Sequence, residues 1–431
     1  MTMSSAPAVG RSVAVLAAAF ICSGAAQAVA ADLGGSCCAD LEQRIAELEA
    51  TAARKGTRKV SLTISGYAAH QITFWDDGKE ENAYLWGMGP TQATHFKLNG
   101  QATISPGWTA GYLMRIQDLS SNPFGSNQTT PNSDQGLNVQ MSYWYLQNTD
   151  LGKVSVGKMA HAGKSAAMFT DLSGTQIAAS YVLFDGAGFF VRNAGALTGV
   201  TWGNLGFCYS QARPWGGDCN GIVMEGVRYD SPTLAGFTVS ASWGEDDFWD
   251  LAARYGGEIA GFKLAGGIAY SRNTSERTQL PLAPFTGFAV KSSDYFQIGG
   301  YAQHLASGLF VHAAYGREDN SDTLLATGRV PEDGRHWYVK GGLRKKWLPL
   351  GHTVLWGEYA AYLDQLGPAA LATGATGSEF DRWGGGLAQE IDAAAMTLWA
   401  KYRRYEAEVA GGTLTDVDDA DFLGIGALIN F

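Results

Sequence analysis

The chain has 431 residues, with 31 Lys and Arg against 41 Asp and Glu, so its formal net charge is −10. Only 17% of the residues are charged, whereas 56 are Gly, 19 are Phe, 18 are Tyr and 13 are Trp. Disorder needs more charge and fewer aromatic rings, and nucleic-acid binding needs a basic surface, so the composition excludes both classes. It predicts many strands with glycine-containing turns, in one large all-β body.

The N-terminus has the pattern of a secretory signal. Residues 1–31 contain one charge, Arg11, followed by an apolar run over 13–21 and then small residues up to Ala31. This order predicts a cleaved signal peptide over 1–31, and a transmembrane anchor is the alternative. No later stretch reaches the roughly 18–20 apolar residues of a membrane-spanning helix. We therefore expect the exported chain to be either soluble or a closed β-barrel.

Cys22 leaves with the signal, and four cysteines remain in a compartment that permits disulfides. Cys208 and Cys219 flank a turn-rich stretch, which predicts a loop-stapling disulfide between them. Cys37 and Cys38 are adjacent and could bridge two chains. No His has zinc-like spacing near either pair, so we expect no metal site.

A short helix is predicted before the body, within a periplasmic segment at 32–57. Asp40 and Gln43 resemble a capping box, and Gly56 fits a C-terminal stop. About fifteen residues are marginal for a lone helix, so this one needs a partner. Self-association as a short coiled coil, packing on its own barrel, and fraying remain open. The heptad seam that favours a coiled coil contains Leu41, Ile45, Leu48 and Ala52.

From Val60 onwards the apolar residues recur at every second position, which is the period of β-strands. In 137–148, for example, Val139, Met141 and Tyr143 alternate with polar residues. A soluble sandwich would alternate too, so this pattern alone does not decide the fold. Other segments of this kind are 94–104, 237–243, 336–344 and 423–431.

The connections between these segments are alternately short and long, as in outer-membrane barrels with tight periplasmic turns and long external loops. The predicted short turns are 105–107, 150–152, 231–236, 258–261, 306–308, 348–351 and 392–394. The longer polar stretches are 76–92, 119–136, 160–185, 207–221, 272–292, 318–334, 363–378 and 408–419, with a briefer one at 244–250.

Each inferred strand has about ten residues, enough to cross a bilayer when tilted. Aromatic residues near strand ends, such as Trp108, Trp243 and Trp347, are typical of the girdles at the two membrane interfaces. Counting gives sixteen to eighteen strands, with 182–211 as the doubtful hairpin, over a barrel domain at 58–431. A barrel of this size encloses an aqueous lumen.

Two ends of the chain resemble a known family. The run 37–66, with its short acidic and basic helix before the first strand, is similar to the opening of alphaproteobacterial, rhizobial-type porins. The last strand ends in Phe431 with apolar residues at every second position back to Leu423, which resembles the assembly signal of outer-membrane proteins. The resemblance implies a sixteen-stranded antiparallel transmembrane barrel, commonly a homotrimer, that forms a passive diffusion pore. We therefore predict sixteen strands.

The resemblance also implies that the third external loop folds into the lumen and narrows it, and 160–185 matches it by position. We expect Lys164, Asp171 and Asp185 of this loop to form the constriction with wall residues. By parity Lys97 and Arg115 point inward on the wall that such a loop approaches. Opposed charges of this kind orient dipolar solutes and set ion preference. Further basic residues on predicted inward faces are Arg254, Arg344, Arg382 and Arg403.

Enzyme signatures such as G-x-S-x-G, H-E-x-x-H and the P-loop are absent from the sequence, so no catalytic site or cofactor is predicted. The sequence predicts a porin of the Gram-negative outer membrane for small hydrophilic solutes and ions, with lipid and lipopolysaccharide as surroundings. A solute-selective channel of the same architecture is the alternative. A barrel-borne enzyme or a structural tether is a weaker one.

Overall fold

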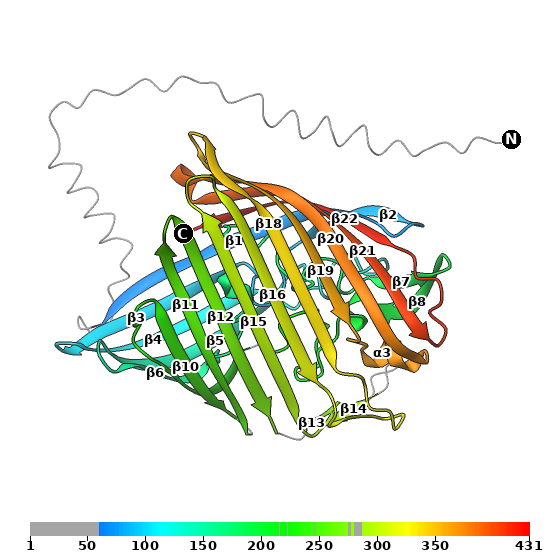
Figure 1. The fold of residues 1–431 in the computed structure, drawn as a ribbon, viewed down its shortest axis with the longest axis horizontal. Coiled ribbons are helices and arrows are strands. Elements are labelled where there is room, and N and C mark those ends of the chain that lie inside the picture. The colour runs from blue at the N-terminus through cyan, green and yellow to red at the C-terminus, as the bar shows by residue number, and fades with distance from the viewer. Residues whose placement is uncertain (1–59, 215, 222, 246, 275–276, 280–286) are drawn as a thin grey trace. The chain divides into compact units, whose positions relative to one another are not determined.

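The computed structural model describes residues 60–431 except 215, 222, 246, 275–276 and 280–286. The predicted signal peptide and the predicted helix at 32–57 lie outside the described residues. Within the described part, no helix combines the length and hydropathy that crossing a membrane would require. Strands make up most of this part of the chain (Figure 1).

Antiparallel strands form one closed barrel. The ring closes where β1 (Ser61–Asp76) pairs with β22 (Ala420–Asn430), from Tyr67 opposite Asn430 to Asp76 opposite Asp421. The sheet contains 17 strands, but β2 (Glu81–Trp86) pairs only with β1. It pairs with residues 71–76 of β1, whereas β3 (His95–Ser105) pairs with residues 61–67 of the same strand. β2 and β3 are therefore two pieces of one wall strand, and the described residues form sixteen wall strands, as predicted. The other wall strands are β4 (Trp108–Asp118), β5 (Leu137–Asn148), β6 (Gly152–Ala160), β9 (Val223–Asp230), β10 (Phe237–Gly244), β11 (Phe248–Ile259), β12 (Phe262–Asn273), β15 (Ser293–His304), β16 (Leu309–Asp319), β18 (Gly334–Leu348), β19 (Gly351–Leu363), β20 (Ala375–Ile391) and β21 (Met396–Gly411).

The alternation of the sequence separates an apolar outside from a polar inside. On β1, Ile72 and Phe74 are 43% and 40% exposed on the outer face, whereas Gln71 and Thr73 are buried inside. Because backbone groups in a closed ring are paired within the sheet, such a wall can face lipid.

A bulge on β5 interrupts the predicted alternation. Val139 lies opposite Ile116 and Met141 lies opposite Arg115, so Gln140 is an extra residue on this strand. The side chains beyond the bulge change faces, and Trp144 is 50% exposed on the outside. The prediction that Val139 and Tyr143 share one face is therefore wrong.

The short predicted turns join wall strands at one end of the barrel, and the long connections lie at the other end. At the end with the long connections lie small elements that are not part of the barrel wall (Figure 1). They are a three-stranded sheet of β13 (Arg277–Gln279), β14 (Phe288–Val290) and β17 (Thr323–Leu325), and the helix α3 (Pro368–Ala372). The 3-10 turn η3 (Asp392–Ala394) joins β20 to β21 at the short-turn end.

The longest connection, residues 161–222 between β6 and β9, is called the inner loop. Its described residues lie mostly inside the barrel, whereas the exposed tip of its hairpin bonds to the loop at 412–419. It unites the predicted stretches 160–185 and 207–221. The doubtful hairpin at 182–211 is part of this loop and not of the wall. It contains η1 (Met168–Thr170), β7 (Phe190–Asn193), β8 (Ala196–Thr201) and η2 (Trp202–Asn204).

An aromatic cluster anchors the middle of the inner loop. Phe189 of the loop contacts the rings of Trp75, Trp86 and Phe422 on the wall. Trp202 of the loop, which is 1% exposed, belongs to the same buried cluster. Burying aromatic side chains stabilises a fold by about 1.5–3 kcal/mol each, so this part of the lumen is a packed core. The aqueous lumen expected from strand count alone is therefore partly filled.

Candidate functional site

The first turns of the inner loop lie directly on the wall, at two glycines. A Cβ atom at Gly299 of β15 would lie 2.6 Å from the carbonyl oxygen of Ala167. One at Gly267 of β12 would lie 2.4 Å from the carbonyl oxygen of Ala166. Any larger residue at these positions would push the loop into the lumen, so the two glycines set how closely it follows the wall.

Gln297 of β15 holds both runs of the inner loop. Its Nε2 donates to the carbonyl oxygen of Gly163 (3.0 Å) and to Oδ1 of Asn220 (2.5 Å). Its Oε1 accepts the N–H of Ala167 (2.8 Å). Gln297 is 0% exposed, so these bonds form away from water, where a missing partner costs about 1–3 kcal/mol. One buried amide therefore fixes the outgoing and returning segments to the same strand.

The start of the loop is held by a buried histidine. His161 Nδ1 pairs with Asp250 of β11, and His161 Nε2 lies 2.7 Å from the carbonyl oxygen of Asn220. The Asp250 carboxylate also accepts the N–H of Gly163 (2.5 Å). These contacts explain why the loop turns along β11 as soon as it leaves β6.

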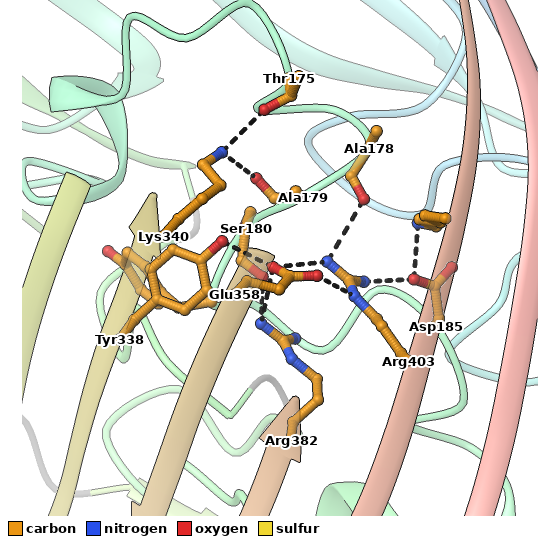
Figure 2. A network of polar contacts seen from close by, with 12 residues as sticks. Thr175, Ala178, Ala179, Ser180, Asp185, Tyr338, Lys340, Glu358, Arg382 and Arg403 are labelled. Carbon is orange, nitrogen blue, oxygen red and sulfur yellow. Dashed lines mark hydrogen bonds and ion pairs between the residues drawn. The ribbon is translucent and has the colours of Figure 1, made fainter. Parts of the chain in front are cut away.

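Asp171 of the loop is held by Lys340 of β18. The Lys340 ammonium lies 2.5 Å from Asp171 Oδ2. It also donates to Thr175 Oγ1 (3.0 Å) and to the carbonyl oxygen of Ala179 (3.0 Å) (Figure 2). Both charged side chains are buried, at 0% and 2% exposed. Burial alone would raise the pKa of Asp171, but the Lys340 charge, the His312 ring and the hydrogen bonds from Lys340 and Ser173 together outweigh it, and the pKa is lowered. The pair is therefore ionised at neutral pH.

Asp185 joins the loop to β21 and β1. Lys401 Nζ lies 2.7 Å from Asp185 Oδ2, and Arg403 bonds to the same oxygen (Figure 2). Gln71 Nε2 donates to Asp185 Oδ1 (3.0 Å). Burial alone would raise the pKa of Asp185, but Lys401 and Arg403 hold it well below the usual value.

A wall carboxylate, Glu358 of β19, links these contacts into one network. Arg403 Nε donates to Glu358 Oε1 (2.8 Å) and Tyr338 Oη donates to Glu358 Oε2 (2.6 Å) (Figure 2). Arg382 Nη2 lies 3.9 Å from the same carboxylate and donates to the carbonyl oxygen of Ser180 (2.5 Å). Because the wall side chains hold loop carbonyls as well as loop acids, we expect the loop to be rigid along this side.

The wall partners of the loop acids differ from those expected. Asp171 and Asp185 contact β18 and β21, because the loop crosses the lumen to that side. Lys97 and Arg115 lie opposite each other on β3 and β4, away from both acids, and Arg115 Nη2 donates to the carbonyl oxygen of Thr91 (2.9 Å). The expectation that these two cations face the loop acids is wrong.

The remaining predicted basic residues all lie inside the barrel next to the loop. Arg254 Nη2 donates to the carbonyl oxygen of Ala162 (2.5 Å). Arg344 forms a bidentate pair with Glu390 (2.8 and 2.7 Å), and a Cβ at Gly174 of the loop would lie 2.7 Å from Glu390 Oε1. Arg382 and Arg403 belong to the network above. Lys164 of the loop is 4% exposed and bonds to Ser165 Oγ (3.3 Å).

Sequence reasoning missed Lys340, Lys401, Glu358 and Gln297. A signal was available, since Lys401 lies two residues before Arg403 and therefore on the same inward face. Lys340 likewise shares the polar face of β18 with Arg344. The alternation of side chains along a strand identifies such residues as inward-facing, but it does not tell which strands the loop will contact.

Cys208 and Cys219 form a disulfide with a Cα–Cα distance of 5.2 Å, which closes the returning part of the inner loop. Glu318 of β16 accepts the backbone N–H groups of Tyr209 (2.9 Å) and Ser210 (2.8 Å) inside this closed loop. Among the described residues, the two cysteines and Glu318 are the only cluster close enough to share a metal ion. Oxidised sulfurs are poor ligands because metal binding needs the thiolate.

A cavity of about 460 Å³ lies between the inner loop and the wall at β20–β22. Tyr67, Trp399 and Leu428 of the wall and Leu172 and Ile177 of the loop form the apolar part of its mixed lining. Polar groups of the loop and of the strand ends line the rest. The space is large enough for a small organic solute.

Comparisons with known proteins agree with this architecture. The family model described as Gram-negative porin matches residues 12–427. No curated protein matches the chain. OprB of Pseudomonas putida is similar in structure, with 12% identity and a TM-score of 0.54 over 91% of this chain and 97% of that one. OmpT of Vibrio cholerae gives 14% and 0.53 over 88% and 99%, and the outer membrane channel DcaP of Acinetobacter baumannii gives 10% and 0.52 over 88% and 100%. At these identities the structural similarity shows the fold alone, but the family match spans nearly the whole chain, and the chain therefore belongs to the Gram-negative porin family.

Proposed function

We propose that the protein forms a water-filled diffusion pore in the outer membrane and that the inner loop sets the width of that pore. The observation that carries this is the closed sixteen-stranded wall with apolar residues outside and a loop fixed inside by buried charges. The contacts of the loop run from β11 round the ring to β1, which leaves the side at β3–β5 for solutes. No reaction is needed for this function, so we infer that the protein is not an enzyme.

Planar-bilayer recording tests the proposal. The purified protein should give stepwise, ohmic conductance that does not depend on any added cofactor. Replacing Gly299 by Val should push the loop from the wall and change the size of the step. Purified, correctly folded protein that never conducts would refute the pore.

A solute-selective channel is the second candidate, favoured by the 460 Å³ cavity beside Trp399 and Tyr67. A pocket with both apolar and polar lining inside a hydrophilic lumen would retain amphipathic solutes. Vesicle-swelling rates for neutral sugars with and without an aromatic group distinguish the two candidates. Permeation that depends on size alone supports the general pore, whereas saturation by the aromatic sugars supports the selective channel.

The finer assignments also belong to this proposal. We infer a homotrimer surrounded by lipid and lipopolysaccharide, with a signal peptide at 1–31 removed on export and a periplasmic helix at 32–57. The family resemblance supports the homotrimer and the periplasmic helix. The apolar outer face of the barrel supports the lipid surroundings, and the pattern of residues 1–31 supports the signal peptide. Intact mass of the protein from outer membranes gives the cleavage site, and native mass spectrometry gives the number of subunits.

A further inference from the structure

Several carboxylates inside the barrel are paired with cations. Asp171 and Asp185 pair with Lys340 and Lys401, as described above. Glu358 pairs with Arg403, Glu390 with Arg344, and Asp230 with Arg228 (2.6 Å). An ionised acid in contact with a cation projects little net charge into the surrounding water. The acids of the inner loop are therefore lost to the pore as a source of negative charge.

Lys97 and Arg115 differ from these paired groups. They lie directly opposite each other on β3 and β4, both on the inner face, and neither forms an ion pair with a carboxylate in the described part of the chain. Arg115 is 8% exposed, and its Nη2 contacts Thr91 and His95. Its Nε has no hydrogen-bond acceptor. A buried guanidinium N–H without an acceptor is costly, so this position favours an incoming anion.

A third cation, Lys164, lies near the same place. Its charge interacts with that of Arg115, and it forms no ion pair within the described residues, although Asp218 partly balances it. Lys97 is the half-exposed member of this group, and Tyr67, which interacts with Arg115, lines the 460 Å³ cavity. Lys164 thus adds a third positive charge that acts on Arg115, and Asp218 is the carboxylate that balances it in part.

The acidic excess of the chain does not contradict this arrangement. On the outer face of β20 and β21, Glu379 lies opposite Glu408 and Asp381 lies opposite Glu406. These four residues share that face with Trp383, which is 40% exposed. Charges outside the wall are separated from the lumen by the barrel and are screened by salt within about 10 Å.

We propose that Lys97, Arg115 and Lys164 form an anion site in the lumen and that the pore prefers small carboxylates and phosphates to cations. This inference rests on the proposed pore function and names its solute class. The Arg115 N–H groups supply direct hydrogen bonds to an anionic oxygen. The two ammonium groups supply charge, which raises the local anion concentration.

The reversal potential of the wild-type pore in a KCl gradient tests the proposal. We expect its sign to show chloride preference. Lys97→Gln and Arg115→Gln should each lower the chloride-to-potassium permeability ratio by about tenfold. One charge about 6 Å from the ion at the dielectric of water attracts chloride and repels potassium by about threefold each, and both effects enter the ratio. Lys97 is half-buried, so its variant serves if the buried Arg115 variant misfolds.

Lys158→Gln is the matched control. Lys158 belongs to the neighbouring hairpin but lies on the outer face with Val154 and Val156, so its removal should leave the ratio unchanged. Inorganic phosphate should inhibit chloride current in the wild type and less so in Arg115→Gln. A potassium-selective wild type, or an equal shift in Lys158→Gln, would overturn the anion site and leave the pore intact. A protein without conductance would instead refute the pore, and this inference with it.

Discussion

Replacing Asp185 by Asn removes the carboxylate that lies between two buried cations of β21. Lys401 forms its only ion pair among the described residues with Asp185, whereas Arg403 also pairs with Glu358. The variant therefore leaves Lys401 buried without an anion. Removing one partner of a buried ion pair costs about 3–5 kcal/mol. We expect the lower end, about 3 kcal/mol, because Arg403 remains compensated.

This loss should appear as local opening of the inner loop. At 1.4 kcal/mol for each factor of ten, about 3 kcal/mol lowers the hydrogen-exchange protection of amides over 176–190 by about two orders of magnitude. Mass spectrometry of exchanged, digested protein measures this directly. Amides of β12, on the far wall, should be unaffected.

Two further variants separate this explanation from a general loss of stability. Asp392→Asn removes an ion pair with Lys346 whose partners are 55% and 52% exposed, so it should cost less than about 1 kcal/mol. Combining Asp185→Asn with Lys401→Met removes the stranded cation and should restore at least half of the lost protection. Equal exchange in Asp185→Asn and Asp392→Asn, or no recovery in the double variant, would refute the reasoning.

The pH dependence of loop docking has a sign that follows from the same contacts. Because Lys401 and Arg403 hold the pKa of Asp185 below that of an unfolded Asp, about 3.9, the carboxylate stabilises the docked loop above that pH. This contribution is lost only as the pH falls further, towards the depressed pKa of the docked state. Loop amides of the wild type should thus stay protected at about pH 4.

Three other predictions follow from the inner loop. Burial lowers the pKa of Lys164 to about 8, so this lysine loses its positive charge as the pH rises from about 7 to about 9. The preference of the pore for anions should weaken over that range. Reversal potentials of the Lys164→Met variant should not change with pH in this way. Reducing the Cys208–Cys219 disulfide should speed proteolysis of 207–220, since a loop this short contributes about 3 kcal/mol; unchanged cleavage would contradict this. Gly299→Val should change the single-channel conductance because it displaces Ala167 of the inner loop. An unchanged conductance would mean that the loop accommodates the larger side chain without narrowing the lumen.

Much of the wall could be predicted from the sequence, because period-two alternation and loop length act locally. The turns at 105–107 and 348–351, for example, join wall strands as expected. The bulge at Gln140 could not be predicted. An extra residue moves the side chains that follow it to the other face of the strand, but it leaves no distinctive residue type in the sequence. The stretch 182–211 was ambiguous because β7 and β8 have strand-like residues but too little length to cross a bilayer.

The site was predictable only in part. Parity identified Arg382 and Arg403 as inward, and the family resemblance pointed to the loop that they hold. The partners depended on which wall the loop reaches, and contacts such as Phe189 with Trp86 decide this. Those contacts join residues about a hundred positions apart or more, so no local pattern contains them.

The partners of the inner loop have a consequence for assembly. Asp171 finds Lys340 after 169 further residues, and Asp185 finds Lys401 after 216. Neither acid is neutralised until these distant strands have joined the wall, and long-range contacts of this kind form slowly. The inner loop therefore docks only when the last hairpins have formed, so closure of the barrel and burial of its charges are a single late event.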